Sequence, residues 1–542
     1  HFANLTFEDG SEITLKNATA AVTGELNGTN CAVTGYVGLT GSAKVIDTYA
    51  GSIRIIEGYT LNSDIDISGE LLIDATLNLN GKTFNVGKNV NVNSYLHVRN
   101  GRLNCKGDFY ANYYSEIYMQ NEKDILNVEG TFTFSNLRYS CDFSNGTLII
   151  GGNCNVNGGD FRATAAHKTI FNGEQKQIIN VTNTYASFGK IIFNNTSEDG
   201  IEVKNSFNYA ELVNESGCKV IFANGGTVGE TLSADKVVDG DYILAMGELD
   251  LNGHTLTING DFIQAGGEVK INSGKLVVNG NYRIQTKKAT EDGKESYDYS
   301  TGILNMTNES DVVEVSGDFV MGSTKSHDGK LSAGTLTVGG NFTQLSYNAR
   351  NNFVASGSHK VIFTSEKNHA ISFDSSRSGE SHFANLTFED DSKITLKNDS
   401  YKRVTVTGSL TGTGCEISGY IDLAGAAKVV NKYKGNIRIS EGYTLNSDIS
   451  ISGNFSAESY LYLNGKQLST DGNVTISSYI GIQSGTLNCK GNLVVNYYSG
   501  RINMDNSSGV IDVEGNFVFN GGDYTSYLTK GKLYIAGDCT IN

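Results

Sequence analysis

The sequence predicts an all-β chain folded as a parallel β-solenoid, and three observations predict it. Residues 1–17 and 382–398 are identical at 15 of 17 positions, and such long-range self-similarity indicates repeat architecture. A short pattern with a central glycine recurs eleven times. The chain contains no proline. Because proline cannot donate to a strand ladder, its absence is typical of strands that are hydrogen-bonded on both sides.

The recurring pattern is apolar-x-apolar-x-Gly-[Asn/Asp/Thr]-apolar, and a twelfth copy has Lys88 in the glycine position. Successive copies are 19 to 24 residues apart within a repeat, apart from one spacing of 37. We interpret the glycines as structural turn residues. They are Gly107, Gly130, Gly152, Gly260, Gly280, Gly317, Gly340, Gly472, Gly491, Gly515 and Gly537.

Apolar residues stand at −4, −2 and +2 from each glycine, as Leu148, Ile150 and Cys154 do around Gly152. Another alternating apolar pair precedes many copies. Alternation with a period of two indicates strands, and no helical period competes with it. We therefore expect three short strands per coil of about 19–24 residues, with the three apolar positions pointing inward and stacking on the next coil.

Longer copies divide the chain into tandem modules of about 190 residues. HKTIF begins at His167 and HKVIF at His359, and LNLNGKT at Leu77 matches LDLNGHT at Leu249 and LYLNGKQ at Leu461. The predicted modules are 1–166, 167–358 and 359–542. We expect the first to lack its beginning and the third its end.

The 37-residue spacing contains a charged, apolar-poor insertion near residues 286–302. One interpretation is a solvated loop. The alternative is a lateral contact or ligand loop, because insertions in solenoids often mark the working face.

Charge and hydropathy limit the partners that we expect. The net charge of −16 argues against a nucleic acid or an anionic membrane surface, since both would require a basic face. No apolar run reaches 18 residues, so we expect no membrane insertion.

The order K-x-I-F, F-x-x-L-x-F, then L-x-L-N-G-x-x-L-x-x-x-G-[ND] resembles the repeat regions of large secreted or surface-attached bacterial β-solenoid proteins of the adhesin and fibre-stalk kind. The resemblance covers essentially the whole chain. It implies an extracellular or cell-surface structural protein, a stiff rod that serves as a stalk or filament subunit. It also implies that the main partner is the protein itself, through end-to-end modules or filament self-association.

The eight cysteines invite a disulfide interpretation, which their register opposes for four of them. Cys105 and Cys489 occupy the −2 position, and Cys154 and Cys539 the +2 position, where we expect buried apolar packing. A Cys141–Cys154 bridge remains an alternative. No cysteine or histidine spacing suggests zinc, and we expect neither a metal nor a cofactor.

We do not expect an enzyme, although parallel β-helices also host polysaccharide-active enzymes. The sequence contains no recognised catalytic motif, and His167 and His359 occupy equivalent places that favour a structural role. Asp390 and Asp391 are the one tempting acidic pair. Adjacent strand residues point to opposite faces, so a catalytic pair is disfavoured.

Glycan binding is the alternative function. Tyr113–Tyr114 recur as Tyr497–Tyr498, and one ring of each pair should point outward, where it could stack on a sugar of a glycan or host surface. The competing interpretation is an exposed aromatic ladder that stabilises the sheet.

Overall fold

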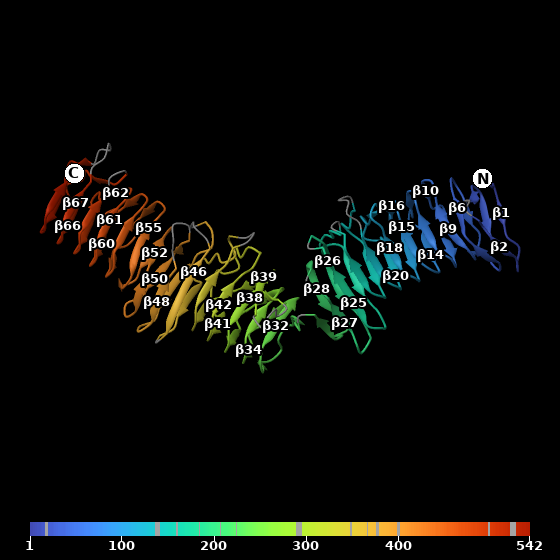
Figure 1. Cartoon of the computed structure of the whole chain (residues 1–542), viewed down its shortest axis with the longest axis horizontal. Helices are drawn as coiled ribbons and strands as arrows, with labels where there is room; N and C mark the ends of the chain where they lie inside the picture. The colour runs from blue at the N-terminus through green and yellow to red at the C-terminus, as the bar shows by residue number, and fades with distance from the viewer. Residues whose placement is uncertain are drawn as a thin grey trace. The chain divides into compact units, whose positions relative to one another are not determined.

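The computed structural model describes residues 1–16, 20–135, 141–158, 161–183, 185–205, 207–223, 225–288, 295–346, 350–365, 367–374, 379–397, 402–496, 499–520 and 527–542. Every named element in these ranges is a β-strand (Figure 1). Accordingly, no helix that could cross a bilayer is found among these residues.

One coil consists of three short strands, as β17 (Arg102–Cys105), β18 (Phe109–Ala111) and β19 (Glu116–Tyr118) illustrate. Each strand pairs in parallel with its counterparts one coil away, so that Leu103 lies between Phe84 and Leu126 in the ladder. About 24 coils of about 21 residues are stacked in this way. The structure confirms the predicted parallel β-solenoid.

The Asn-Gly motif explains one corner of the coil in each repeat. Asn80 and Gly81 both have positive φ angles, of 51° and 75°, and Lys82 N–H donates to the Leu79 carbonyl at 2.9 Å. Two positive φ values in succession define the type I′ turn that Asn-Gly prefers. The same geometry recurs at 252–253 and at 464–465.

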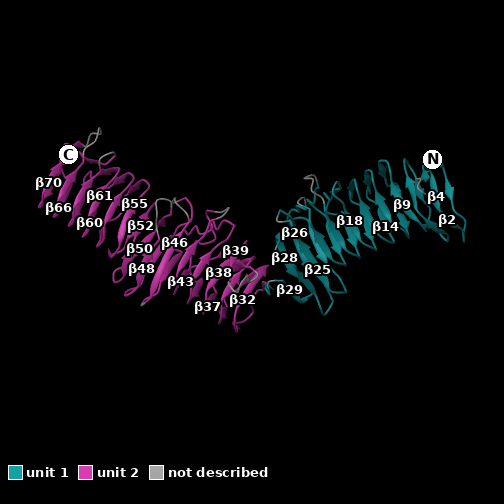
Figure 2. Cartoon of the chain, viewed as in Figure 1, with its two compact units in different colours: residues 1–227 teal, residues 228–542 magenta. Residues whose placement is uncertain are grey.

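The chain forms two compact units, His1–Thr227 and Val228–Asn542 (Figure 2). In the first unit, an 11-stranded sheet runs from β3 (Ala20–Val22) to β29 (Val220–Phe222). A nine-stranded sheet and shorter sheets complete its coils. Neither predicted module boundary coincides with the division between the units, so the three-module division remains a description of the sequence copies.

In the second unit, a nine-stranded sheet extends from β31 (Lys236–Val238) to β53 (Lys428–Val429). Later coils are built from sheets of eight, six and five strands. The six-stranded sheet begins at β54 (Lys432–Tyr433) and ends at β69 (Lys532–Ile535). The outer face of this sheet carries the groove described below.

The insertion in the second unit projects as a hairpin. Strands β38 (Tyr282–Lys287) and β39 (Tyr297–Tyr299) pair antiparallel, whereas the other described strand pairs are parallel. Lys287 forms an ion pair with Glu295, and Arg283 lies 4.9 Å from the Tyr297 ring centroid. The hairpin's described charges are thus partly matched within the insertion itself. Residues 289–294 lie outside the described residues.

The core of each unit is a stack of inward side chains. At the pattern glycines from Gly107 to Gly515, the residues at −4, −2 and +2 are buried, as the sequence predicts. Aromatic residues stack on their equivalents one coil away: the Phe319 and Phe342 ring centroids are 5.3 Å apart with an interplanar angle of 20°. In the last coil, Cys539 is exposed rather than buried, because a neighbouring coil covers only one of its sides.

Inward and outward residues of one strand should differ sharply in their contribution to stability. In β63 (Thr486–Cys489), Leu487 is fully buried and Asn488 points outward. We expect Leu487→Ala to lower the free energy of unfolding by about 2–5 kcal/mol, because it leaves a cavity between stacked coils. Asn488→Ala, one residue further along, should cost less than about 1 kcal/mol. Chemical denaturation of both variants measures the difference, and equal losses would contradict the assigned strand faces.

Candidate functional site

The predicted glycines lie in register on successive coils and are bonded to one another. Gly130 N–H donates to the Gly107 carbonyl at 3.1 Å, and Gly152 N–H donates to the Gly130 carbonyl at 2.9 Å. The same link joins Gly491 to Gly472 at 3.1 Å. The eleven glycines therefore belong to a ladder that joins the coils.

Close approach, not backbone conformation, requires glycine in this ladder. None of the eleven, all of them described, takes a positive φ angle. A Cβ atom added at Gly491 would lie 2.6 Å from the Gly472 carbonyl oxygen and 2.5 Å from Asn473 Oδ1. Such distances leave no space for a side chain.

The residue after the glycine has a role that the sequence analysis missed. Asn473 Oδ1 accepts the backbone N–H of Asn492 one coil further on, at 2.8 Å, and Asn492 Oδ1 accepts the N–H of Asn516 at 2.8 Å. The acceptor oxygen therefore occupies the space that a Cβ of the next glycine would need. The sequence signal for this role is the repeated Asn or Asp directly after the glycine. The preference of these residues for turns explains the same signal equally well.

A matched pair of glycine substitutions tests this ladder. Gly491→Ala should destabilise the chain by about 1–3 kcal/mol, because the added methyl group must push neighbouring coils apart. Gly442 has no atom within 4 Å of an added Cβ and no positive φ, so Gly442→Ala should change stability by less than about 0.5 kcal/mol. Thermal or urea unfolding measures both variants. Equal stability of the two would show that the ladder tolerates a side chain.

The predicted tyrosine contact surface is described in one of its two copies. Tyr113 and Tyr114 are 50% and 59% exposed, and their ring centroids lie 4.7 Å apart with planes at 77°. The rings meet edge to face and thus present no shared flat surface. Tyr497 and Tyr498 lie outside the described residues.

The eight cysteines, all described, form no disulfide bond. The alternative Cys141–Cys154 bridge is therefore not formed. Cys105, Cys154 and Cys489 are buried among core side chains, as their register predicts. Burial raises the pKa of the Cys105 thiol to about 12, which keeps it protonated and unreactive.

His167 and His359 occupy equivalent buried positions immediately before strands β24 (Lys168–Phe171) and β45 (Lys360–Phe363). Burial lowers the pKa of each imidazole to about 4. His167 Nδ1 lies 2.8 Å from the Asn145 carbonyl oxygen, whereas neither ring nitrogen of His359 has a hydrogen-bond partner among the described residues. Both side chains are neutral at pH 7 and act as core residues there.

These histidines should make the solenoid sensitive to acid. Because the folded-state pKa is about 4 and the ordinary value 6.5, the unfolded chain takes up protons first. Stability is complete above pH 6.5 and falls as the pH decreases towards 4, by up to about 3 kcal/mol for each such group.

The two histidines can be separated by substitution. We expect His359→Leu to match or exceed the parent stability at pH 7, because it removes two unbonded polar atoms from the core. His167→Leu should lower the free energy of unfolding by about 1 kcal/mol at pH 7, because it removes the hydrogen bond to the Asn145 carbonyl. Both variants should lose less stability than the parent between pH 7 and pH 4.5, as followed by urea midpoints. An unchanged acid response would contradict the role of burial.

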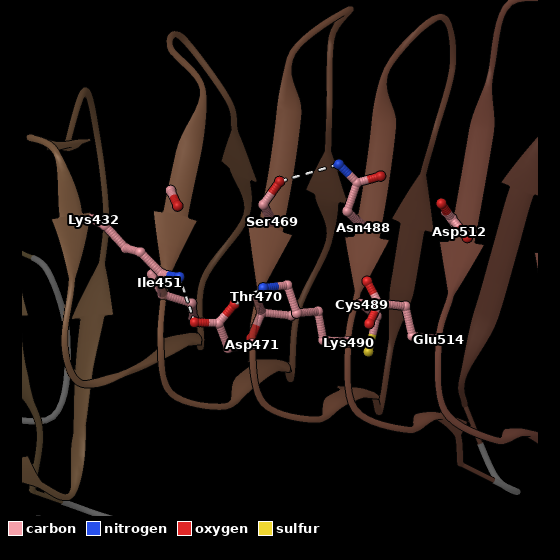
Figure 3. A pocket seen from close by; sticks show the side chains of 11 residues that line it. Lys432, Ile451, Ser469, Thr470, Asp471, Asn488, Cys489, Lys490, Asp512 and Glu514 are labelled. Carbon is pink, nitrogen blue, oxygen red and sulfur yellow. Dashed lines mark hydrogen bonds and ion pairs between the residues drawn. The ribbon is translucent and has the colours of Figure 1, made fainter. Parts of the chain in front are cut away.

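A surface groove of about 370 Å³ lies on the outer face of the six-stranded sheet (Figure 3). Its floor is an outward row of polar residues on successive strands, among them Ser469, Asn488 and Asp512. Asn488 Nδ2 donates to Ser469 Oγ at 3.2 Å. The groove is thus a hollow in the polar outer ladder.

The charged side chains at one end of the groove form ion pairs with one another. Asp471 forms ion pairs with Lys432 and, at 2.9 Å, with Lys490. Hydrogen bonds from these two lysines lower the pKa of Asp471. Asp471 is therefore fixed in its ionised form and cannot serve as a proton donor near neutral pH.

The acidic pair at Asp390 and Asp391 forms an exposed turn between strands β47 (Asn385–Phe388) and β48 (Lys393–Leu396). Asp391 has a φ angle of 64°, as Gly10 has at the equivalent place, where φ is 75°. Asp390 Oδ1 accepts a hydrogen bond from Thr413 Oγ1 at 3.2 Å. This geometry assigns the pair a role in the turn.

Within the described ranges, no group of three or more histidine, cysteine, aspartate or glutamate side chains is arranged to hold a metal ion. The chain matches no protein-family model. Comparison with curated proteins and with solved structures also gives no match. The class that the structure defines is a β-solenoid repeat protein.

Proposed function

We propose that this chain has a mechanical function outside the cell, as a stiff solenoid rod in a surface stalk or a filament. The observation that carries the proposal is the inter-coil ladder within each unit. Neighbouring coils of a unit are joined by parallel strand pairs, by the glycine links and by the side chains of the Asn or Asp that follow.

Uniform nearest-neighbour bonding supports a load-bearing role. In a solenoid, stability is the sum of repeat terms and interface terms, so extension is achieved by adding coils. Outward residues are free to differ between copies: Arg99 of the first copy corresponds to Gln483 of the last. Coils pair through backbone hydrogen bonds that further coils of the same kind can continue, which favours the protein itself as the partner. The resemblance to surface-attached bacterial solenoids supports the extracellular assignment.

Electron microscopy of the native protein tests this proposal. We expect uniform fibres or rods with an axial repeat that matches one or two modules, located at the cell surface or in the medium. Short rods that end in a globular head would reduce this segment to a spacer for that head. Compact intracellular particles would contradict the mechanical function.

A further inference from the structure

Three tyrosines gather on the outer face of the five-stranded sheet, and we refer to Tyr460, Tyr462 and Tyr479 as the tyrosine cluster. Two of them belong to β59 (Leu461–Tyr462) and β62 (Tyr479–Gly481). Leu461 and Ile480 pair in this sheet and are buried, so strand alternation directs Tyr462 and Tyr479 outward. Strand β62 is labelled near the red end of the chain in Figure 1.

The rings lie close together and are supported from below by a glycine. The ring centroid of Tyr479 is 5.8 Å from that of Tyr460 and 5.4 Å from that of Tyr462, with interplanar angles of 45° and 55°. A Cβ atom at Gly481 would lie 2.8 Å from Tyr462 Cδ1 and 3.2 Å from Tyr479 Cε1. Any larger residue at 481 would therefore displace the two rings.

A polar group holds the central ring of the cluster. Asn503, on β65 (Arg501–Met504), donates from Nδ2 to the Tyr479 hydroxyl at 3.0 Å. The hydroxyl accepts this bond and keeps its own proton for donation. The cluster thus combines aromatic faces with an oriented hydroxyl group.

The fold does not require this cluster, because the corresponding sheet differs in the other copies. In the first unit, His97 stands in the place of Gly481, and its ring stacks on Tyr118 at 4.4 Å and 4°, so each ring covers the other. In the middle of the chain, the matching strands carry Lys270 and Glu248, which form an ion pair at 2.6 Å. The same coil is therefore built without an open aromatic surface.

We propose that the tyrosine cluster is a binding site for a neutral glycan. The C–H faces of pyranose rings stack on aromatic faces, and a sugar oxygen accepts a hydrogen bond from the Tyr479 hydroxyl, whose orientation Asn503 fixes. The chain's net charge of −16 disfavours an acidic polysaccharide. This inference goes beyond the mechanical function and does not depend on it.

Titration of the intact chain with cellohexaose, chitohexaose and mannohexaose tests the site. Because the chain has 28 tyrosines and no tryptophan, calorimetry or ligand-observed NMR is the readout. We expect at least one of these oligosaccharides to bind. Tyr479→Ala should weaken that binding at least tenfold and Tyr460→Ala severalfold. Tyr118→Ala is the matched control, because it removes a tyrosine from the corresponding sheet of the first unit. It should leave the affinity unchanged.

The variants must also be shown to fold, so that a loss of binding is not caused by unfolding. Tyr460 is 58% exposed, so Tyr460→Ala should unfold at the parent temperature, and Tyr479→Phe retains the ring while it removes the hydroxyl. The proposal is overturned if none of the three oligosaccharides binds, or if binding survives Tyr479→Ala. Equal loss in Tyr118→Ala would also overturn it. Self-association in sedimentation that Tyr460→Ala abolishes would assign the surface to a second copy of the chain instead.

Discussion

The structure depends on one contact between neighbouring coils, in which the side-chain oxygen of an Asn or Asp occupies the space that a Cβ of the next glycine would need. Asn473 Oδ1 lies 2.5 Å from the position of such an atom at Gly491, and it accepts the N–H of Asn492. The glycine permits the close approach of the two coils. The side-chain oxygen stabilises it, because it accepts a hydrogen bond from a backbone N–H at the corner of the coil. The glycine and the Asn or Asp after it therefore act together in joining neighbouring coils, and this explains why they recur together.

The spacing that this contact imposes determines what the rest of each coil can be. Inward side chains must pack on their equivalents at the distance between paired strands. Phe319 and Phe342 do so with nearly parallel rings, 5.3 Å apart at 20°, whereas Tyr282 and Phe319 meet edge to face at 90°. Outward residues meet no such requirement. They form a polar row with a shallow groove on one sheet and an aromatic cluster on another, while a charged pair, Glu248 and Lys270, occupies the matching strands of a different copy. The same scaffold can thus present different surfaces along its length.

The fold could be predicted from the sequence because inward positions repeat with a period of two and coils repeat near 22 residues. Leu276, Val278 and Tyr282 are buried around Gly280 as the pattern indicates. The role of the Asn or Asp could not be separated from ordinary turn preference, since both explanations demand the same residue. The tyrosine cluster was not predicted, because its members come from different coils and meet only when the ladder register is known. Cys539 takes the ladder position that its register predicts, opposite Phe517, but its expected burial is wrong, because burial of an inward residue requires a coil on both sides.

Native-state hydrogen exchange, followed by mass spectrometry along the chain, is the most direct test of the inter-coil ladder. The account predicts strong and similar protection of the amides at the glycine and the following residue in interior coils, such as Gly317, Asp318, Gly340 and Asn341. Each of these N–H groups donates to the preceding coil, at 2.8 to 2.9 Å. Fast exchange at these corners, with protection confined to the strands between them, would contradict the claim that this contact joins the coils.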